Sequence, residues 1–339
     1  MKTQDMGEFA TGLVAHKLVF ACRTTTCMQV PEYAGAAVRG ALFGALRFQV
    51  CTLHGAGRAG GTEWLAGCPV CALFAPADPD ADRGKDIARP ISIESPLSLG
   101  GLRPAGWTFS FGLTLFGQAV SLYPYIAAGT QVMGRIGLGR YRDAPGQFEV
   151  CECWSEEPLN GQRLRIMETQ TTALQMPLLP IDDSSVAERV RYLRQDLAGE
   201  RGIRRVAIQF LTPTRLISDG RLAAAPAFPV LIRRVLRRVS DLCQTTGVGV
   251  PKVDFTALVG MAERINLAAS DLEWIDLTSA SARTGVATPI GGLVGEAEYE
   301  GDLDQFIPWL LWAEVTHIGK DATKGNGLCK VIARKTQAE

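Results

Sequence analysis

The 339-residue sequence lacks an excess of charge of either sign and lacks any long hydrophobic run. Lysine and arginine total 35, as do aspartate and glutamate, so the formal net charge is zero. Any contact with RNA or DNA must therefore come from local basic patches. No run approaches the roughly 18 apolar residues of a membrane span, and the first ten residues include Asp5 and Glu8 in place of a basic, apolar signal segment. We expect a cytoplasmic protein with no membrane segment.

Cysteine and histidine are also scarce. The nine cysteines are odd in number and unevenly clustered, which argues against a secreted disulfide framework and favours a reducing compartment with one metal site. Hydrophobic residues make up 47% and charged residues 21% of the chain, as in ordinary folded proteins, so disorder is excluded. The length predicts two domains or one large one.

The first half, residues 8–180, has the pattern of an α+β domain. Gly12–Cys22 is rich in β-forming residues, and Ala34–Val50 has the apolar spacing of an amphipathic helix. Residues 51–90 are rich in Gly, Pro and Asp and predict a cysteine-containing surface insertion. Further elements are expected as strands at Ile91–Ser95, Gly106–Leu115 and Gln147–Trp154, and as a helix interrupted near Pro124 at Ala119–Met133.

The second half, residues 200–335, repeats this order. Met176–Asp183 contains two prolines and marks a boundary, and the charged Ser184–Glu200 follows as a helix. A strand at Arg205–Phe210 ends in the turn signal Thr212-Pro213-Thr214. The later elements are an amphipathic helix at Pro229–Cys243, strands at Leu272–Leu277, Leu293–Tyr299 and Cys329–Ala333, and a short helix at Leu303–Trp312. The predicted fold is α+β with two tandem ferredoxin-like domains, because each half reads strand, helix, strand, strand, helix, strand.

Glycine-rich segments lie near the end of each half, at Gly134–Arg140 and Gly319–Gly327. Their spacing fits neither the Walker nor the Rossmann pattern, so no nucleotide cofactor is expected. Glycines allow backbone amides to approach phosphate closely, and arginines and lysines nearby supply positive charge. The alternative is a tight loop packed on its own sheet.

Three segments carry a family resemblance: Val38–Gly44, Ile208–Leu216 and Gly295–Gly327. Together they resemble the CRISPR-associated RAMP-type endoribonucleases that process the repeat in precursor CRISPR RNA, in particular the branch with a long carboxy-terminal domain. The last segment departs from the family pattern at Lys324 and Asn326, where an aromatic and a small or aliphatic residue are usual. The resemblance implies two RRM-like domains side by side, RNA bound across them, and cleavage of the repeat without a catalytic metal.

Cleavage by a 2′-hydroxyl needs a proton acceptor, a proton donor and positive charge for the phosphorane. Histidine suits proton transfer near pH 7, and the sequence has three. The catalytic candidates are His317, where the resembled family often has a histidine, His16 on the first predicted strand, and Tyr33, where some relatives use a tyrosine. A structural role is the alternative for each of them.

The third histidine belongs to a metal-ligand pattern. Cys51 and His54 form a C-x-x-H pair, and Cys68 and Cys71 form a C-x-x-C pair after a spacer of thirteen residues. Four such ligands match tetrahedral zinc, and a site with four protein ligands is structural. The alternative is reduced cysteines without metal, which would leave His54 as a catalytic candidate.

Basic residues give the candidate RNA contacts. Four arginines lie on one face of the helix at Pro229–Cys243, where a solvated helix face is the alternative. The full set of candidate contacts is Arg39, Arg135, Arg140, Arg233, Arg234, Arg237, Arg238, Lys320, Lys324, Gly325 and Gly327. The sequence thus predicts an endoribonuclease that cuts precursor CRISPR RNA within repeats, or else a non-catalytic RNA-binding subunit of a CRISPR effector complex.

Overall fold

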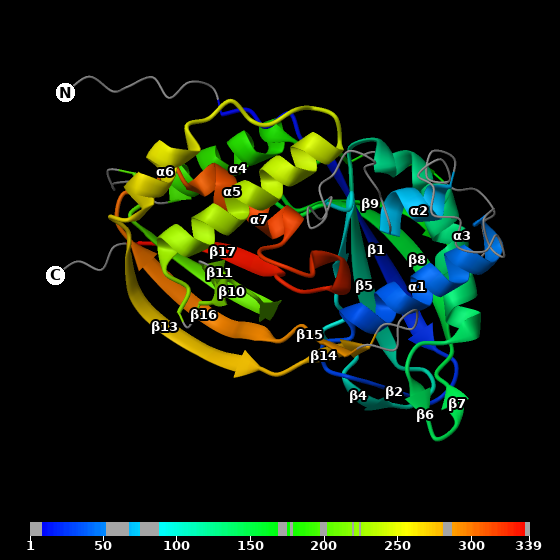
Figure 1. The fold of residues 1–339 in the computed structure, drawn as a ribbon. Helices are drawn as coiled ribbons and strands as arrows, with labels where there is room; N and C mark the ends of the chain where they lie inside the picture. The colour runs from blue at the N-terminus through cyan, green and yellow to red at the C-terminus, as the bar shows by residue number, and fades with distance from the viewer. Residues whose placement is uncertain are drawn as a thin grey trace.

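The fold consists of two sheets, each covered on one face by helices, as seen in a computed structural model (Figure 1). The structure describes residues 9–51, 68–74, 88–168, 175–176, 179–196, 202–218, 220–223, 225–280 and 287–335. No helix within these ranges is both long and apolar enough to cross a membrane.

The first sheet has the strand order β3-β5-β1-β8-β9, with every neighbouring pair antiparallel. Its first four strands along the chain take the spatial order 2-3-1-4, which is the ferredoxin-like arrangement. The main elements are β1 (Ala15–Thr24), α1 (Gly35–Gln49), β3 (Ile91–Glu94), β5 (Thr108–Phe116), α3 (Tyr123–Ile136), β8 (Phe148–Glu157) and β9 (Gln162–Glu168). The short ones are β2 (Met28–Val30), α2 (Pro69–Phe74), β4 (Gly101–Arg103), η2 (Gly117–Leu122), β6 (Arg140–Tyr141) and β7 (Ala144–Pro145).

The second sheet has the order β13-β16-β10-β17, again 2-3-1-4 for its strands along the chain. Helices α5 and α7 pack together over one face of it (Figure 1). The main elements are α4 (Asp183–Asp196), β10 (Arg205–Thr214), α5 (Phe228–Thr245), α6 (Phe255–Ala262), β13 (Asn266–Ile275), β16 (Gly292–Glu300), α7 (Ile307–Thr316) and β17 (Cys329–Arg334). The short ones are β11 (Ile217–Ser218), β12 (Arg221–Leu222), β14 (Thr278–Ala280), β15 (Ala287–Pro289) and η3 (Ala322–Lys324). The predicted pair of ferredoxin-like domains is confirmed.

Local sequence explains most of these elements. The buried residues of β1 alternate along Leu18, Phe20 and Cys22, as in a strand with one covered face. Helix α3 begins after a 3₁₀ turn, and Pro124 lies in its first turn, where a missing N–H costs nothing, so the predicted interruption is confirmed.

Several element boundaries differ from the prediction, including those of β10, α7 and β13. β10 continues through the expected turn to Thr214, with a break in register after Phe210 that accommodates Pro213. Helix α7 begins at Ile307 in place of Leu303, because Pro308 favours the first helical turn. β13 begins at Asn266, six residues before the predicted Leu272.

The amino-terminal segment is tied to the second domain. The carboxylate of Asp183 at the start of α4 accepts hydrogen bonds from the Thr11 amide at 2.7 Å, the Thr11 hydroxyl at 2.8 Å, the Gly12 amide at 2.8 Å and the Trp312 indole at 3.1 Å. Leu13 is buried in the same core as α5 and α7. This carboxylate therefore joins the chain start, α4 and α7.

Candidate nucleic-acid interface

A basic cavity of about 490 Å³ lies where the two domains meet. It is lined by eight basic side chains and only two acidic ones, although the whole chain is neutral. The charged lining residues are Arg39, Arg89, Arg215, Arg234, Arg237, Arg238, Asp241, Lys320, Asp321 and Lys324. Positive charge is thus concentrated in one concave place, which focuses the electrostatic field on an anionic ligand.

Five segments bring these side chains together, one of which holds Arg215 just after β10. Arg39 comes from the middle of α1 and Arg89 from the segment before β3, so both belong to the first domain. The second domain contributes α5 and the loop that holds η3, and η3 packs against α1. On α5 the apolar face, which includes Leu231 and Val235, is buried, so its arginines lie on the opposite flank.

The two carboxylates in the cavity already have partners. Asp241 pairs with Arg237 at 3.5 Å, and Asp321 pairs with Lys324 at 2.9 Å. Burial, and next the nearby Arg89, lower the pKa of the Arg39 guanidinium, with Asp321 acting in the opposite direction. Like charges held this close favour a bound anion such as phosphate.

The glycines of the last loop are structural. A Cβ on Gly325 would lie 2.8 Å from the Gly35 Cα of α1, and both Gly325 and Gly327 are buried. Their amides donate within the protein, from Gly325 to the Ala322 carbonyl at 3.2 Å and from Gly327 to the Pro213 carbonyl at 3.1 Å. These two residues therefore pack the loop against α1 and β10, and neither lines the cavity, while their contact with RNA stays a prediction.

Arg238 also has an internal role. Its guanidinium donates to the Thr316 carbonyl and to the Ser92 hydroxyl, each at 3.2 Å, and so connects α5 and α7 with β3 of the first domain. Burial lowers the pKa of Arg238 to about 10. The expectation that this arginine lies on an exposed basic face is corrected. Arg238 lines the cavity at the contact between the two domains.

The other predicted arginines divide between cavity and surface. Arg234 and Arg237 line the cavity, whereas the exposed Arg233 on the same helix does not. Arg135 lies in the last turn of α3, and Arg140 lies on β6, where it donates to the Asp143 carbonyl at 3.1 Å. Neither lines the cavity, and the β6–β7 ribbon lies at the far end of the first domain (Figure 1).

His317 is fully buried at the end of α7. Its φ of +65° and ψ of 158° place it in a backbone region that glycine favours. The ring Nδ1 lies 3.1 Å from the Asn326 carbonyl, and Nε2 has no hydrogen-bond partner. Burial lowers the pKa of His317 to about 4, so the imidazole is neutral. This histidine contacts the glycine loop through the Asn326 carbonyl and does not line the cavity.

The remaining catalytic candidates also lie away from the cavity lining. His16 is half-buried on β1 opposite Leu115, and burial lowers its pKa. Burial, then Glu32 and Glu273, raise the pKa of Tyr33, which makes it a poorer proton acceptor at neutral pH. His54 lies outside the described residues.

Two cavity arginines escaped the sequence prediction. Arg89 stands at the end of the Gly-, Pro- and Asp-rich stretch, where no periodicity marks it. Arg215 follows the predicted turn that is in fact strand, and its guanidinium donates to the Pro289 carbonyl at 3.2 Å. In the sequence, the only indication of each of these two cavity residues was a single basic residue beside a glycine- or proline-rich segment.

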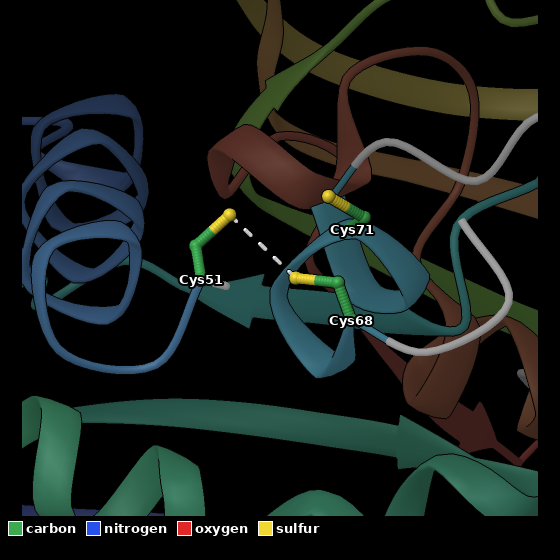
Figure 2. Close-up of side chains that lie close together, drawn as sticks. All are labelled: Cys51, Cys68 and Cys71. Atoms are coloured by element: carbon green, nitrogen blue, oxygen red, sulfur yellow. Dashed lines mark hydrogen bonds between the residues drawn. The ribbon is translucent and has the colours of Figure 1, made fainter. Parts of the chain in front are cut away.

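Three cysteine thiols form a second site beside this cavity. The sulfur atoms of Cys51, Cys68 and Cys71 all lie within 4.8 Å of one another, and those of Cys51 and Cys68 are 3.6 Å apart (Figure 2). Burial acts to raise the pKa of the Cys68 thiol, but hydrogen bonds from Cys71 and Cys51 outweigh it and lower the pKa. The cluster has the spacing and the soft donors to hold a metal ion.

Two family models match the chain. Residues 13–178 match a model described as an N-terminal domain, and residues 208–329 match the model described as CRISPR-associated endoribonuclease Cas6. The chain is similar to the Cas6 family over its second domain. The Cas6 match runs from β10 to the start of β17 and so includes α5 and the glycine loop. Among curated proteins, no match to the sequence is found.

Solved structures share the fold at low sequence identity. A partial Cas6-RT-Cas1–Cas2 complex matches 96% of this chain with a TM-score of 0.61 and 12% identity. The chain spans 47% of the length of that protein. Thermus thermophilus Cas6 matches 94% of this chain over 99% of its own length, with a TM-score of 0.54 and 13% identity. A Cas6 product complex gives the same TM-score at 14% identity, with 94% of this chain and 99% of that one covered. These matches support the tandem ferredoxin-like fold.

Proposed function

We propose that this protein is an endoribonuclease that cleaves precursor CRISPR RNA within its repeats, with the RNA bound across the cavity between the domains. The observation that carries the proposal is the set of eight basic side chains gathered from both domains around one cavity. Its carboxylates are already paired, so an incoming phosphate meets a surplus of positive charge. The Cas6 family model over residues 208–329 supports the same activity.

The chemistry follows from what the cavity offers. Attack of a 2′-hydroxyl on the adjacent phosphate leaves a 2′,3′-cyclic phosphate and a 5′-hydroxyl, and cations such as Arg39 and Lys324 stabilise the crowded phosphorane. No catalytic metal is required for this reaction. His317, His16 and Tyr33 stay the proton-transfer candidates predicted from the sequence, and the burial of His317 favours a positioning role for it through the Asn326 carbonyl.

Two arginines of α5 provide a matched test of the RNA site. Arg237 lines the cavity, and Arg233, one helical turn earlier, is equally exposed to solvent but does not. We expect Arg237→Ala to weaken binding of the repeat RNA about threefold to tenfold and to reduce its salt slope by about one, because one phosphate contact is lost. Arg233→Ala should leave both unchanged. Equal effects of the two substitutions would move the RNA away from the cavity.

Cleavage is tested with the repeat RNA encoded in the host genome, labelled at its 5′ end, in excess EDTA. A single cut that survives EDTA supports a metal-independent nuclease. The second candidate function is a non-catalytic RNA-binding subunit, and it is favoured by one observation: neither described histidine lines the cavity. Tight binding that depends on Arg237 without any cut would establish this alternative.

We also propose that the thiol cluster holds a structural zinc ion. Cys51, Cys68 and Cys71 supply three thiolates, and the sequence assigns His54 as the fourth ligand. Zinc would stabilise the stretch at residues 51–90, which has few apolar residues to form a core of its own. Protein purified without chelator should contain about one equivalent of zinc, and under half an equivalent would refute the ligand assignment.

Partners follow from the same proposal. Precursor CRISPR RNA is the substrate, and other CRISPR proteins are candidate partners, since one matching fold comes from a Cas6-RT-Cas1–Cas2 complex. The cytoplasm is the compartment that the cysteine pattern of the sequence predicts.

A further inference from the structure

The thiol cluster and the basic cavity are connected through one short helix. Cys68 precedes α2, Cys71 lies within it, and Phe74 ends it. Three residues of helix advance about 4.5 Å, so Phe74 lies less than one turn beyond the Cys71 thiol. Figure 2 shows Cys71 on α2 and Cys68 just before it, while Cys51 approaches from the end of α1.

Phe74 contacts two cavity arginines at once. Its backbone carbonyl accepts a hydrogen bond from the Arg89 Nε at 2.9 Å, and its ring lies 5.7 Å from the Arg39 guanidinium in a cation–π contact. The ring is almost completely buried and packs edge-on against Phe43 of α1 at 5.6 Å. Arg39 and Arg89 both line the cavity. Phe74 is thus a shared support for two cations of the proposed RNA site.

These two arginines need such a support. They come from different segments and carry like charges, and Arg89 contributes to the lowered pKa of Arg39. The Arg39 Nε is buried without a hydrogen-bond partner among the described residues. Without Phe74, repulsion would favour separation of the two guanidinium groups.

The three thiols lie on the two segments that meet near Phe74. Cys51 stands two residues after the last residue of α1, the helix that carries Arg39, while Cys68 and Cys71 belong to α2 and its start. A metal ion held by all three would fasten the end of α1 to α2. A helix of six residues has little stability of its own, so its placement depends on such a contact.

We propose that a metal ion at Cys51, Cys68 and Cys71 positions Arg39 and Arg89 through Phe74, so that metal loading sets the affinity of the cavity for RNA phosphates. This inference rests on the proposed RNA-binding function. The metal contacts no RNA in this arrangement, and its effect is transmitted by α2. Affinity is lost on metal removal because two cations leave their paired position.

The test compares zinc-loaded with zinc-stripped protein, using anisotropy of the labelled repeat RNA and metal analysis of each sample. We expect stripping to weaken RNA binding about tenfold and to lower the salt slope by about one to two, as for the loss of two phosphate contacts. In the double variant Arg39→Ala/Arg89→Ala, stripping should change neither quantity. In Arg237→Ala, an arginine without a contact to Phe74, stripping should still weaken binding about tenfold.

Circular dichroism shows whether the zinc-stripped protein unfolds. If it does, a second pair of variants tests whether Phe74 affects RNA binding in the zinc-loaded protein. Phe74→Leu keeps the core apolar but removes the ring beneath Arg39, so the zinc-loaded variant should bind RNA more weakly at unchanged zinc content. Phe43→Leu, in the neighbouring ring, should bind RNA normally.

The possible results separate the two claims. Equal RNA affinity with and without zinc, or normal binding by Phe74→Leu, would overturn this inference while the RNA site stands. Protein that takes up no metal would do the same. Zinc-loaded wild-type protein that binds no RNA would overturn the proposed function and this inference with it.

Discussion

Two titratable side chains of α7, Glu314 and His317, should give opposite and nearly cancelling contributions to the pH dependence of stability. They stand three residues apart on the helix. Burial raises the pKa of Glu314 to about 7, although the Val331 amide donates a hydrogen bond to the carboxylate, which acts to lower the pKa. Burial lowers the pKa of His317 to about 4. Both shifts favour the neutral form inside the protein.

The signs follow from proton uptake. For His317 the unfolded chain, with a pKa of 6.5, binds more protons than the folded one, so stability rises with pH between about 4 and 6.5. For Glu314 the folded protein keeps its proton longer than the unfolded chain, with a pKa of 4.5, so stability falls with pH between about 4.5 and 7. From pH 5 to pH 7 each group changes the free energy of unfolding by about 2 kcal/mol, in opposite directions.

Urea unfolding at pH 5 and pH 7 measures this pair. Relative to wild type, His317→Gln should lose about 2 kcal/mol of stability between pH 5 and pH 7, because the Glu314 contribution is no longer opposed. Glu314→Gln should gain about the same amount over that interval. Only the change with pH within each variant is compared, so the fixed cost of a buried substitution cancels. Charged neighbours from other elements, Lys17, Glu94 and Arg238, are present in all three proteins. Parallel pH profiles for the three proteins would refute the reasoning.

Three further predictions concern stability and charge. Gly35→Ala should destabilise the protein in spite of the better helix propensity of alanine, because its Cβ would lie within 3 Å of the Lys324 carbonyl oxygen. Gly40→Ala in the same helix meets no atom within 4 Å and should stabilise the protein by about 0.5–1 kcal/mol. Thermal unfolding of the two variants measures the difference. Asp183→Ala should cost about 3 kcal/mol or more in urea unfolding, since four hydrogen bonds to a carboxylate are lost, and a cost below 1 kcal/mol would contradict its joining role. Asp321→Asn should tighten RNA binding at low salt by freeing Lys324, and an unchanged affinity would remove this lysine from the site.

The periodicity of the sequence was enough for most elements of the fold. The helices α1 and α5 and the strands β1, β3, β5, β8, β10, β16 and β17 lie where apolar spacing predicted them, because each element buries one face against its own sheet. The edge strand β9 was not predicted, and β13 begins earlier than predicted. Two of the misplaced ends have a common cause in proline: Pro213 is accommodated within a strand, and Pro308 begins a helix that was expected earlier. Proline restricts the backbone in several elements, so its presence alone does not distinguish a turn from a bulge.

The candidate site was less predictable because it depends on contacts between distant segments. The contact of Gly35 with Gly325 joins residues 290 positions apart, and nothing in either local sequence indicates it. Arg237 and Arg238 are adjacent on one amphipathic helix and both line the cavity, yet only Arg238 also donates a hydrogen bond to Ser92 of the first domain. Helical periodicity identifies the apolar face but not which polar flank a second domain will cover.

The placement of carboxylates explains how a neutral chain forms a basic cavity. On the first sheet Glu94 and Glu156 pair with Lys17 and Arg163. Additional pairs on the two sheets are Arg23–Glu149, Arg165–Glu152, Arg165–Glu168, Arg205–Glu298, Arg334–Glu296 and Arg334–Glu298. Strand residues on a sheet face are directly opposite one another, so acids and bases there neutralise each other. These carboxylates are therefore neutralised on the sheets, and the cavity retains eight basic residues against two paired carboxylates. A local surplus of this kind attracts RNA without a positive field over the whole protein.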